Sequence, residues 1–562
     1  MPIISSFGGI VPRLPWHSLP VTGATIAHDV KLRNGKLEPW RERLAVGTAV
    51  ANAVSVHYHG CCYYTFNKCV DMAEYVADYG RLYVTGRNSY PEVAKINGCA
   101  LTYNRLGVPQ PTNAPTVAGT QSEGREVSAR NYVYTFVNQY GEEGAPSYPS
   151  AQLNIADGSG VVVSGFQIPD GVYGVVSINI YRTSTAWSTG EEKTQSIQTD
   201  YLLVATVPVG TSSYTDTVLE RNLGSVIDTE FVHEPPADLR KIRYLRGTGV
   251  LTGVTNNKVY FTKPFQPHNW PVEYELTLPY NIVNVETLGN RMFVSTDAFP
   301  FVINGAPNCE ARQCRPVTEV FTPLPDISCG HENSSVATPF GMVYSSKDGL
   351  VLVSTNGTFQ IITSAWFSTD DWVKIRPDTA RLAYWRGYII CVTDLISFML
   401  DIDGKTYNDI EGSNLVTISD RPVAMTTTQA GELIMLENGV LWQWNAGDTY
   451  REYKWTSREL NFGGKSTPTT AKVMTDGINL HLVDMDGNHM YDRFVADAEP
   501  VRLKRLGRQR CWRLSFTGKG TVEYAALSMI FNALEGNTRN GTTTLRTIFN
   551  ALEGNTHNGT TI

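Results

Sequence analysis

Charge is scarce in this sequence, and long apolar runs are missing. Charged residues make up 18% of the 562 residues, whereas roughly 25% is usual in globular proteins. No run reaches the length of about 18 consecutive apolar residues that a membrane helix needs, so we expect no membrane segment. The N-terminal run MPIISSFGGIVPRLP lacks the basic start and apolar core of a secretory signal. We therefore expect the protein to mature in the cytoplasm in which it is made.

The sequence also lacks the paired motif of a structural zinc site. Such sites combine two separate pairs of Cys or His ligands, and a single group with no downstream partner is present here. Its members are His57, His59, Cys61, Cys62 and Cys69. We predict that these are buried strand residues and that the chain has no metal site.

Motifs for hydrolysis are missing as well. Asp401 with Asp403, and Asp484 with Asp486, each precede a glycine, but both runs lack the later acidic ligand that closes a calcium loop. Asx turns between strands explain them better. No local motif sets two carboxylates across a cleft, as glycoside hydrolysis requires. We predict no catalytic residue, no cofactor and no enzyme activity.

Nine cysteines are present, and an odd number cannot all pair within one chain. In a reducing compartment the expected state is a buried, reduced thiol that packs as a small hydrophobe. The net charge of −7 argues against a protein that grips DNA, because phosphate binding depends on Lys and Arg. A mildly acidic surface would suit a conduit through which DNA slides.

What is abundant points to β-structure. The sequence has 48 Gly and 28 Tyr, a composition that suits many short strands closed by tight turns. Strand–turn–strand units recur every ~40–50 residues, which is typical of propeller blades. These units are Leu251–Thr262, Leu288–Gly305, Met342–Thr363, Ala383–Gly404 and Glu432–Trp444. We expect an N-terminal strand to close the last blade, which would remove an exposed edge.

The remaining segments complete a mostly β, multi-domain chain. Alternation in Tyr132–Val137 and strands at Val175–Arg182 and Tyr201–Thr217 predict a fibronectin III-like β-sandwich. Arg33–Lys36, RNGK, predicts a two-residue hairpin turn. The expected domains are N-terminal strands with a first propeller blade (1–108), the inserted sandwich (109–222), β-propeller blades (223–454), a C-terminal β module (455–527) and two 18-residue repeats (528–562).

Several runs carry a resemblance to a known family. The opening places Phe7-Gly8-Gly9-Ile10 and Pro12 ahead of Leu32, Asn34, Gly35, Leu37 and Pro39, and the middle contains KVYFTKPFQPHNWP at Lys258–Pro271. LGNRMFVST, FVING and GMVYSSKDGLVLVST follow, YVTG and PEV stand near residues 83–93, and Trp512, Arg513 and Gly518 stand near the end. This succession resembles the tail nozzle (tail tubular protein B-like) family of short-tailed bacteriophages.

The resemblance implies a structural virion protein. It implies a β-propeller around a DNA channel, with one blade placed before an inserted domain. It further implies a homo-hexamer at the distal end of the tail, below the adaptor protein, which passes DNA during genome ejection and carries tail fibres. The protein would be made in the host bacterial cytoplasm and end in the virion. Two alternatives are a receptor-binding or glycan-degrading tail protein on a propeller scaffold, and a propeller scaffold of the host cell.

Two near-identical repeats end the chain and lie outside the family pattern. Their apolar residues fall at helical spacing: Leu527, Ile530, Phe531, Leu534, Leu545, Ile548, Phe549 and Leu552. A helix of two turns is unstable alone in water, so each repeat must dock on another surface. That surface is either a neighbouring subunit or tail protein, or a groove of the same chain.

One basic cluster stands out in the run VRLKRLGRQRCWR. Its members are Arg502, Lys504, Arg505, Arg508 and Arg510, together with Arg513. Contact with DNA phosphates or with an acidic partner surface is one interpretation. The other is a solvated strand edge that charge protects from aggregation.

Overall fold

The computed structural model describes residues 2–32, 34–75, 80–120, 127–186, 196–310, 313–315, 334–402, 414–504 and 506–529. The chain divides into two compact units. Unit 1 comprises Met1–Asn67, Cys329–Ser354 and Thr358–Ile562, and unit 2 comprises Lys68–Ser328 and Thr355–Gly357. No helix of the described residues is long and apolar enough to cross a membrane.

Helices are short and few among these residues. The α-helix is α1 (Thr369–Lys374), capped by the Ser368 side chain, which accepts the Asp371 N–H. The 3-10 turns are η1 (Trp16–Ser18), η2 (Gly171–Tyr173), η3 (Glu220–Asn222), η4 (Val272–Tyr274) and η5 (Pro377–Thr379). Strands make up the rest of the regular structure.

Unit 2 begins with antiparallel sheets of strands consecutive in sequence, the meander of a propeller blade. The first sheet is β8 (Asp71–Glu74), β9 (Arg81–Thr85), β10 (Glu92–Asn97) and β11 (Ala100–Arg105). The second is β20 (Arg240–Leu245), β21 (Val250–Val254), β22 (Lys258–Phe261) and β23 (Leu276–Thr277), and the third is β24 (Ile282–Leu288), β25 (Arg291–Thr296) and β26 (Phe301–Asn304). A hairpin of β27 (Asn308–Glu310) and β28 (Gln313–Arg315) follows.

A β-sandwich is inserted between the first and second of these sheets. One layer is β12 (Thr116–Ala118), β16 (Val161–Ser164) and β19 (Ser213–Asp216), the other is β14 (Tyr132–Asn138), β17 (Val175–Ala186) and β18 (Ser196–Pro208), and β13 (Val127–Arg130) pairs with β15 (Leu153–Ala156). Tyr134, Phe136 and Ile178 belong to its apolar core. A buried ion pair joins Arg182 to Asp216 at 3.4 Å.

Unit 1 contains three further blades of four strands among the described residues, and the second of them is part of a ten-stranded sheet. They are β29 (Ser335–Thr338), β30 (Gly341–Ser345), β31 (Leu350–Ser354) with β32 (Phe359–Ile361); β33 (Arg381–Trp385), β34 (Tyr388–Val392), β35 (Ser397–Asp401) with β36 (Leu415–Thr417); and β37 (Ala424–Thr427), β38 (Leu433–Glu437), β39 (Val440–Gln443) with β5 (Leu44–Thr48). β5 pairs with β39, Val440 facing Thr48. The predicted closure of the last blade by an N-terminal strand is confirmed.

The predicted turns explain why these blades form. Asn438 and Gly439 both have positive φ, 53° and 74°, as do Arg386 and Gly387, 46° and 88°. Two consecutive residues in this region form the type I′ turn, whose twist matches that of the flanking strands. Among the described residues, the strands within each predicted strand–turn–strand unit pair with one another in one sheet.

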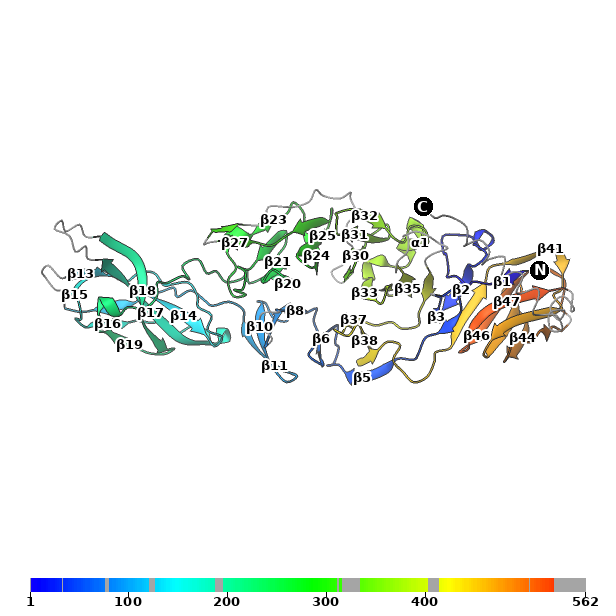
Figure 1. Cartoon of the computed structure of the whole chain (residues 1–562), viewed down its shortest axis with the longest axis horizontal. Coiled ribbons are helices and arrows are strands. Elements are labelled where there is room, and N and C mark those ends of the chain that lie inside the picture. Colours follow the sequence, from blue (N-terminus) through cyan, green and yellow to red (C-terminus); the bar gives the residue numbers. More distant parts are fainter. Residues whose placement is uncertain are drawn as a thin grey trace, which may run out of the picture. The chain divides into compact units, whose positions relative to one another are not determined.

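The C-terminal module is built from both ends of the chain. β1 (Ile3–Ile4) pairs with β47 (Val522–Ser528), which continues to β42 (Thr470–Thr475) and β45 (Val501–Arg502). β2 (Ala24–His28) lies between β36 and β40 (Tyr453–Ser457), and the sheet continues to β46 (Gln509–Gly518), β43 (Ile478–Val483) and β44 (His489–Val495), with β41 (Leu460–Ser466) on β46. Figure 1 shows the blue N-terminal strands among the orange and red C-terminal ones.

These sheets confirm the predicted fold class. The chain is a mostly β, multi-domain protein with β-propeller blades, an inserted fibronectin III-like β-sandwich and a C-terminal β module. The domain boundaries drawn from the sequence remain predictions.

The two-residue hairpin predicted at Arg33–Lys36 is wrong in its length. β3 (Val30–Lys31) does pair with β4 (Glu38–Pro39), so a hairpin exists, but six residues separate Lys31 from Glu38. Leu32 and Leu37 are buried, and Leu37 pairs with Val522 of β47. Burial of these two leucines holds the loop open, because a two-residue turn would pull them out of the core.

The expectation of buried, reduced cysteines holds in part. Cys391 and Cys511 are buried free thiols, whereas Cys61 and Cys69 are exposed. Cys62 and Cys99 are each disulfide-bonded, which contradicts the expectation for these two. Cys61 is exposed because it lies outside strand β7 (Cys62–Phe66), with a positive φ of 68° in the turn after β6 (Ser55–His59).

These environments predict which free thiols react. Burial raises the pKa of Cys391, and burial together with Glu459 raises the pKa of Cys511 to about 11. At pH 8 both remain protonated, and the thiolate is the nucleophile. We expect iodoacetamide to label Cys61 and Cys69 in the native protein and Cys391 and Cys511 only after denaturation. Mass spectrometry of tryptic peptides measures this, and native labelling of Cys391 would contradict it.

Candidate functional site

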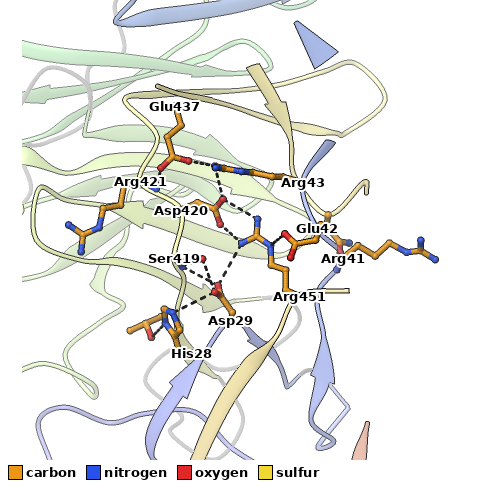
Figure 2. Close-up of polar contacts among 12 residues, drawn as sticks. His28, Asp29, Arg41, Glu42, Arg43, Ser419, Asp420, Arg421, Glu437 and Arg451 are labelled. Carbon is orange, nitrogen blue, oxygen red and sulfur yellow. Dashed lines mark hydrogen bonds and ion pairs between the residues drawn. The ribbon is translucent and has the colours of Figure 1, made fainter. Parts of the chain in front are cut away.

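A cluster of charged side chains joins five segments of unit 1 (Figure 2). We define the charged cluster as Asp29, Glu42, Arg43, Asp420, Glu437 and Arg451. Asp29 lies between β2 and β3, the pair 42–43 directly precedes β5, Asp420 follows β36, Glu437 ends β38 and Arg451 precedes β40. The cluster therefore connects the N-terminal segment to the last blade and to the C-terminal module.

Arg451 lies at the centre of the charged cluster. Its guanidinium donates two hydrogen bonds to Asp420, one of them 3.0 Å long, and lies 3.7 Å from Asp29 and 3.5 Å from Glu42. The side chains of Arg451 and Asp420 are 6% and 3% exposed. Burial opposes the charge on Arg451, but Asp420, Asp29 and Glu42 outweigh it and raise the pKa of the guanidinium. The ring of Trp444 lies 4.4 Å below this cation.

Arg43 makes a second bridge across the same carboxylates. Its Nη1 contacts Glu437, and it lies 3.1 Å from Asp420. Its guanidinium lies over the Trp442 ring at 4.2 Å, where a cation is attracted to the face of the ring. The other oxygen of Glu437 accepts the backbone N–H of Arg421 at 3.1 Å. β5, β38 and the segment after β36 are thus tied together.

Asp29 anchors the N-terminal side of the charged cluster. Its carboxylate accepts the backbone N–H of Ser419 at 3.1 Å and the hydroxyl at 2.7 Å. Its φ of 53° is unusual for a residue other than glycine. Its own N–H donates to Thr417 at 2.9 Å, and His28 donates or accepts at Thr417 Oγ1 at 2.9 Å. These contacts hold a backbone conformation that would otherwise be strained.

The charged cluster lines a cavity of about 400 Å³. Four carboxylates face two guanidinium groups, so the cluster carries a formal excess of two negative charges. Nearly every buried carboxylate oxygen already accepts a hydrogen bond from Arg451, Arg43 or Ser419. Groups that are paired in this way hold chain segments in register and leave little capacity for acid–base chemistry. We interpret the charged cluster as a structural element that holds the N-terminal segment, the last blade and the C-terminal module together.

The predicted basic cluster lies on the C-terminal module. β45, which contains Arg502, is an edge strand, and Arg502, Lys504, Arg508 and Arg510 are all exposed. Lys504, Arg508 and Arg510 form no ion pair with the described residues, and Arg505 lies outside them. Val501 and Leu503 alternate with Arg502 and Lys504 and are buried. This alternation fits a protected strand edge, and contact with DNA or an acidic partner remains a prediction.

The predicted docking repeats fall mostly outside the described residues. Ile530, Phe531, Leu534, Leu545, Ile548, Phe549 and Leu552 are not described. Leu527 lies in strand β47, pairs with Ala471 and is fully buried, so it is a core residue of the module and not part of a docking helix. The run Ala525–Leu527 is buried throughout, and a strand buried on both faces cannot be told from a helix by spacing alone.

The acidic runs and histidines behave differently from one another. Asp484 accepts the backbone N–H groups of Asp486 and Asn488 at 3.0 and 2.8 Å, which confirms the Asx turn predicted there. Asp403 lies outside the described residues.

The histidines of the predicted group His57, His59, Cys61, Cys62 and Cys69 lie on a strand. His57 and His59 lie on β6, half-buried. A different group, His481, His489 and Asp492, brings its ligand atoms together within 4.8 Å.

Comparison with known proteins does not assign a family to this chain. No protein-family model matches it, and no curated protein matches it. Among solved structures it is similar to Hsv2 of Kluyveromyces lactis (8% identity, 72% of this chain and 92% of that chain, TM-score 0.24) and to the Pan2 WD40 domain of Neurospora crassa (8%, 68% and 89%, TM-score 0.25). It is also similar to AztD of Citrobacter koseri, with 10% identity over 53% of this chain and 72% of that chain and a TM-score of 0.19. Similarities at these TM-scores are too weak to assign a family or a function to this chain.

Sequence reasoning did not find the charged cluster. Asp29, Asp420 and Arg451 stand about 30 to 420 residues apart, and each alone is an ordinary charged residue. One feature of the sequence could have indicated the cluster, namely the pair of tryptophans in LWQW at 441–444. In the folded protein their ring faces contact the guanidinium groups of Arg43 and Arg451.

Proposed function

We propose that this protein is the distal nozzle of a short-tailed phage tail, a structural component through which the genome is ejected. The observation that carries the proposal is the place of the β-sandwich. It is inserted after the blade β8–β11 and before the blade β20–β23, the order that the sequence resemblance implies. The residues YVTG and PEV that carry part of the resemblance lie in and beside β9 and β10.

The N-terminal FGGI run supports the same proposal. A Cβ on Gly9 would lie 2.3 Å from the carbonyl oxygen of Leu415, so glycine is required where the two backbones meet. Ile10 N–H donates to that oxygen at 2.9 Å. The residues of the resemblance thus have a structural role here: they seat the N-terminal segment against the blade that ends in β36.

The net negative charge of the chain also supports the proposal of a DNA channel. Six copies would carry 6 × −7 = −42 formal charges, from the net charge of −7 per chain, and a lumen of this sign would not hold phosphates. The sandwich offers a place for fibres, and the adaptor protein would lie above the ring.

Cryo-electron microscopy of the intact virion tests the proposal. A peptide tag inserted at Gly210, an exposed turn with open space around it, marks the sandwich, and untagged virions serve as the matched control. We expect a sixfold ring at the distal end of the tail, with the tag density outside an axial channel. Tag density in peripheral spikes would favour the receptor-binding or glycan-degrading alternative, and its absence from the virion would overturn the proposal.

A further inference from the structure

Two histidines and one aspartate converge at the outer edge of the C-terminal module. His481 lies on β43, and His489 and Asp492 lie on β44, the last strand of its sheet. Oδ1 of Asp492 contacts Nδ1 of His481 and lies 3.0 Å from Nδ1 of His489. The two imidazole rings are 4.9 Å apart. Three potential ligand atoms therefore face one point.

A β-bulge produces this convergence. In a regular strand, residues three apart point to opposite faces, so His489 and Asp492 would be separated. Here Leu482 pairs with Tyr491 and the next residue, Val483, pairs with His489, so that Met490 is the extra residue. The extra residue of a bulge re-aims the side chains next to it. The bulge brings His489 to the face that carries His481 and Asp492.

The surroundings hold the ring of His481 and the backbone next to His489 in place. Nε2 of His481 lies 2.7 Å from Thr517 Oγ1 on the neighbouring strand β46, which fixes the ring with Nδ1 toward Asp492. Metal-binding histidines make a contact of this kind through their second nitrogen. The Asx turn at Asp484 fixes Asn488, the residue directly before His489, through its backbone and its side-chain amide at 3.1 Å.

We propose that His481, His489 and Asp492 form a binding site for a divalent transition-metal ion of the Zn²⁺, Ni²⁺ or Co²⁺ class. The two Nδ1 atoms and one carboxylate oxygen are the ligands. Imidazole and carboxylate together suit these metals, whereas Mg²⁺ and Ca²⁺ prefer oxygen ligands alone. Bonds of about 2.0–2.1 Å require the ligand atoms to separate slightly from their present hydrogen-bonding distances.

The exposure of the three side chains determines whether a bound metal ion would be in contact with solvent. His481 is largely buried, with 13% of its side chain exposed, while His489 and Asp492 are 44% and 56% exposed. Three protein ligands leave at least one coordination position open, and this position faces solvent. The proposal is independent of the proposed nozzle function, because it depends only on the hairpin β43–β44 and its neighbour β46.

Metal titration of the full-length protein tests the site. The protein is prepared without a histidine tag, its exposed thiols are blocked with iodoacetamide, and it is cleared of metal with a chelator before calorimetric titration with ZnCl₂. We expect a saturable Zn²⁺ equivalent that His489→Ala and Asp492→Asn each weaken at least about tenfold. Excess Mg²⁺ should not displace it. Titration with Co²⁺ should give visible absorption bands in the wild type but not in His489→Ala or Asp492→Asn.

Matched controls keep the outcome decisive. His17→Ala removes an exposed histidine elsewhere in unit 1 and should leave the affinity unchanged. Asp492→Asn keeps the size of the side chain on an exposed position, so its fold should survive, as circular dichroism would verify. Absence of saturable binding in the wild type, or equal binding by the wild type and both cluster variants, would overturn the proposal and leave a hydrogen-bonded His–Asp group.

Discussion

Replacing Arg451 by methionine is expected to lower the free energy of unfolding by about 3–5 kcal/mol, as measured by urea denaturation followed by circular dichroism. Removal of one partner from a buried ion pair leaves the other charge uncompensated, at a cost of this size. Asp420 and Asp29 are 3% and 8% exposed, and Arg43 alone would remain to face four carboxylates. Methionine keeps an apolar stem beside Trp444, so the loss would report on charge.

An exposed pair supplies the matched control for Arg451→Met. Arg376 lies 2.9 Å from Asp378, with both side chains more than half exposed, and Arg376→Met should cost less than about 1 kcal/mol. An equal loss of stability in Arg451→Met and Arg376→Met would contradict the charge-based account.

The blades were predictable because their signals are local. In the unit Glu432–Trp444, Asn438-Gly439 marks the turn, and the flanking apolar residues become β38 and β39 within one residue of the prediction. Asn and Gly adopt positive φ readily, and a two-residue turn fixes the register of both strands. No long-range information is needed for such a unit.

The C-terminal module was only partly predictable, because it needs pairing across the whole chain. Ile3 pairs with Ala526, and Ala24 pairs with Ser457. Nothing in a single sequence links residues so far apart, and the N-terminal strands are short, so their periodicity says little. The charged cluster could not be predicted for the same reason. Its residues lie far apart in the sequence, and only the folded chain brings their side chains into contact.

The histidine group shows a second limit of sequence reasoning. Strand periodicity puts His489 and Asp492 on opposite faces, so a pattern search rejects them as joint ligands. The bulge at Met490 reverses this. His57 and His59 present the opposite case, because they satisfy the spacing rule but belong to no close ligand group among the described residues.

Both ends of the chain meet at one aromatic group, which leads to the second large effect. Trp455 on β40 is fully buried. Its ring lies edge-on to Phe7 at 5.0 Å and stacks on Phe516 at 6.0 Å, and its Nε1 donates to the carbonyl of Gly8 at 3.0 Å. The indole therefore holds the N-terminal segment on the module through packing and one hydrogen bond.

Trp455→Ala is expected to destabilise unit 1 by about 3–5 kcal/mol, because truncation of a buried tryptophan loses apolar burial and leaves a cavity. Trp16→Ala is the matched control, since Trp16 is 43% exposed, and a surface change of this kind should stay within about 0.5 kcal/mol. Limited proteolysis adds a specific readout: cleavage after Arg13 should accelerate in Trp455→Ala, because the N-terminal segment loses its anchor, and stay slow in Trp16→Ala. Equal stability of the two variants would mean that the N-terminal segment is held by β1 and β2 alone, and the aromatic anchor would have no role in joining the ends of the chain.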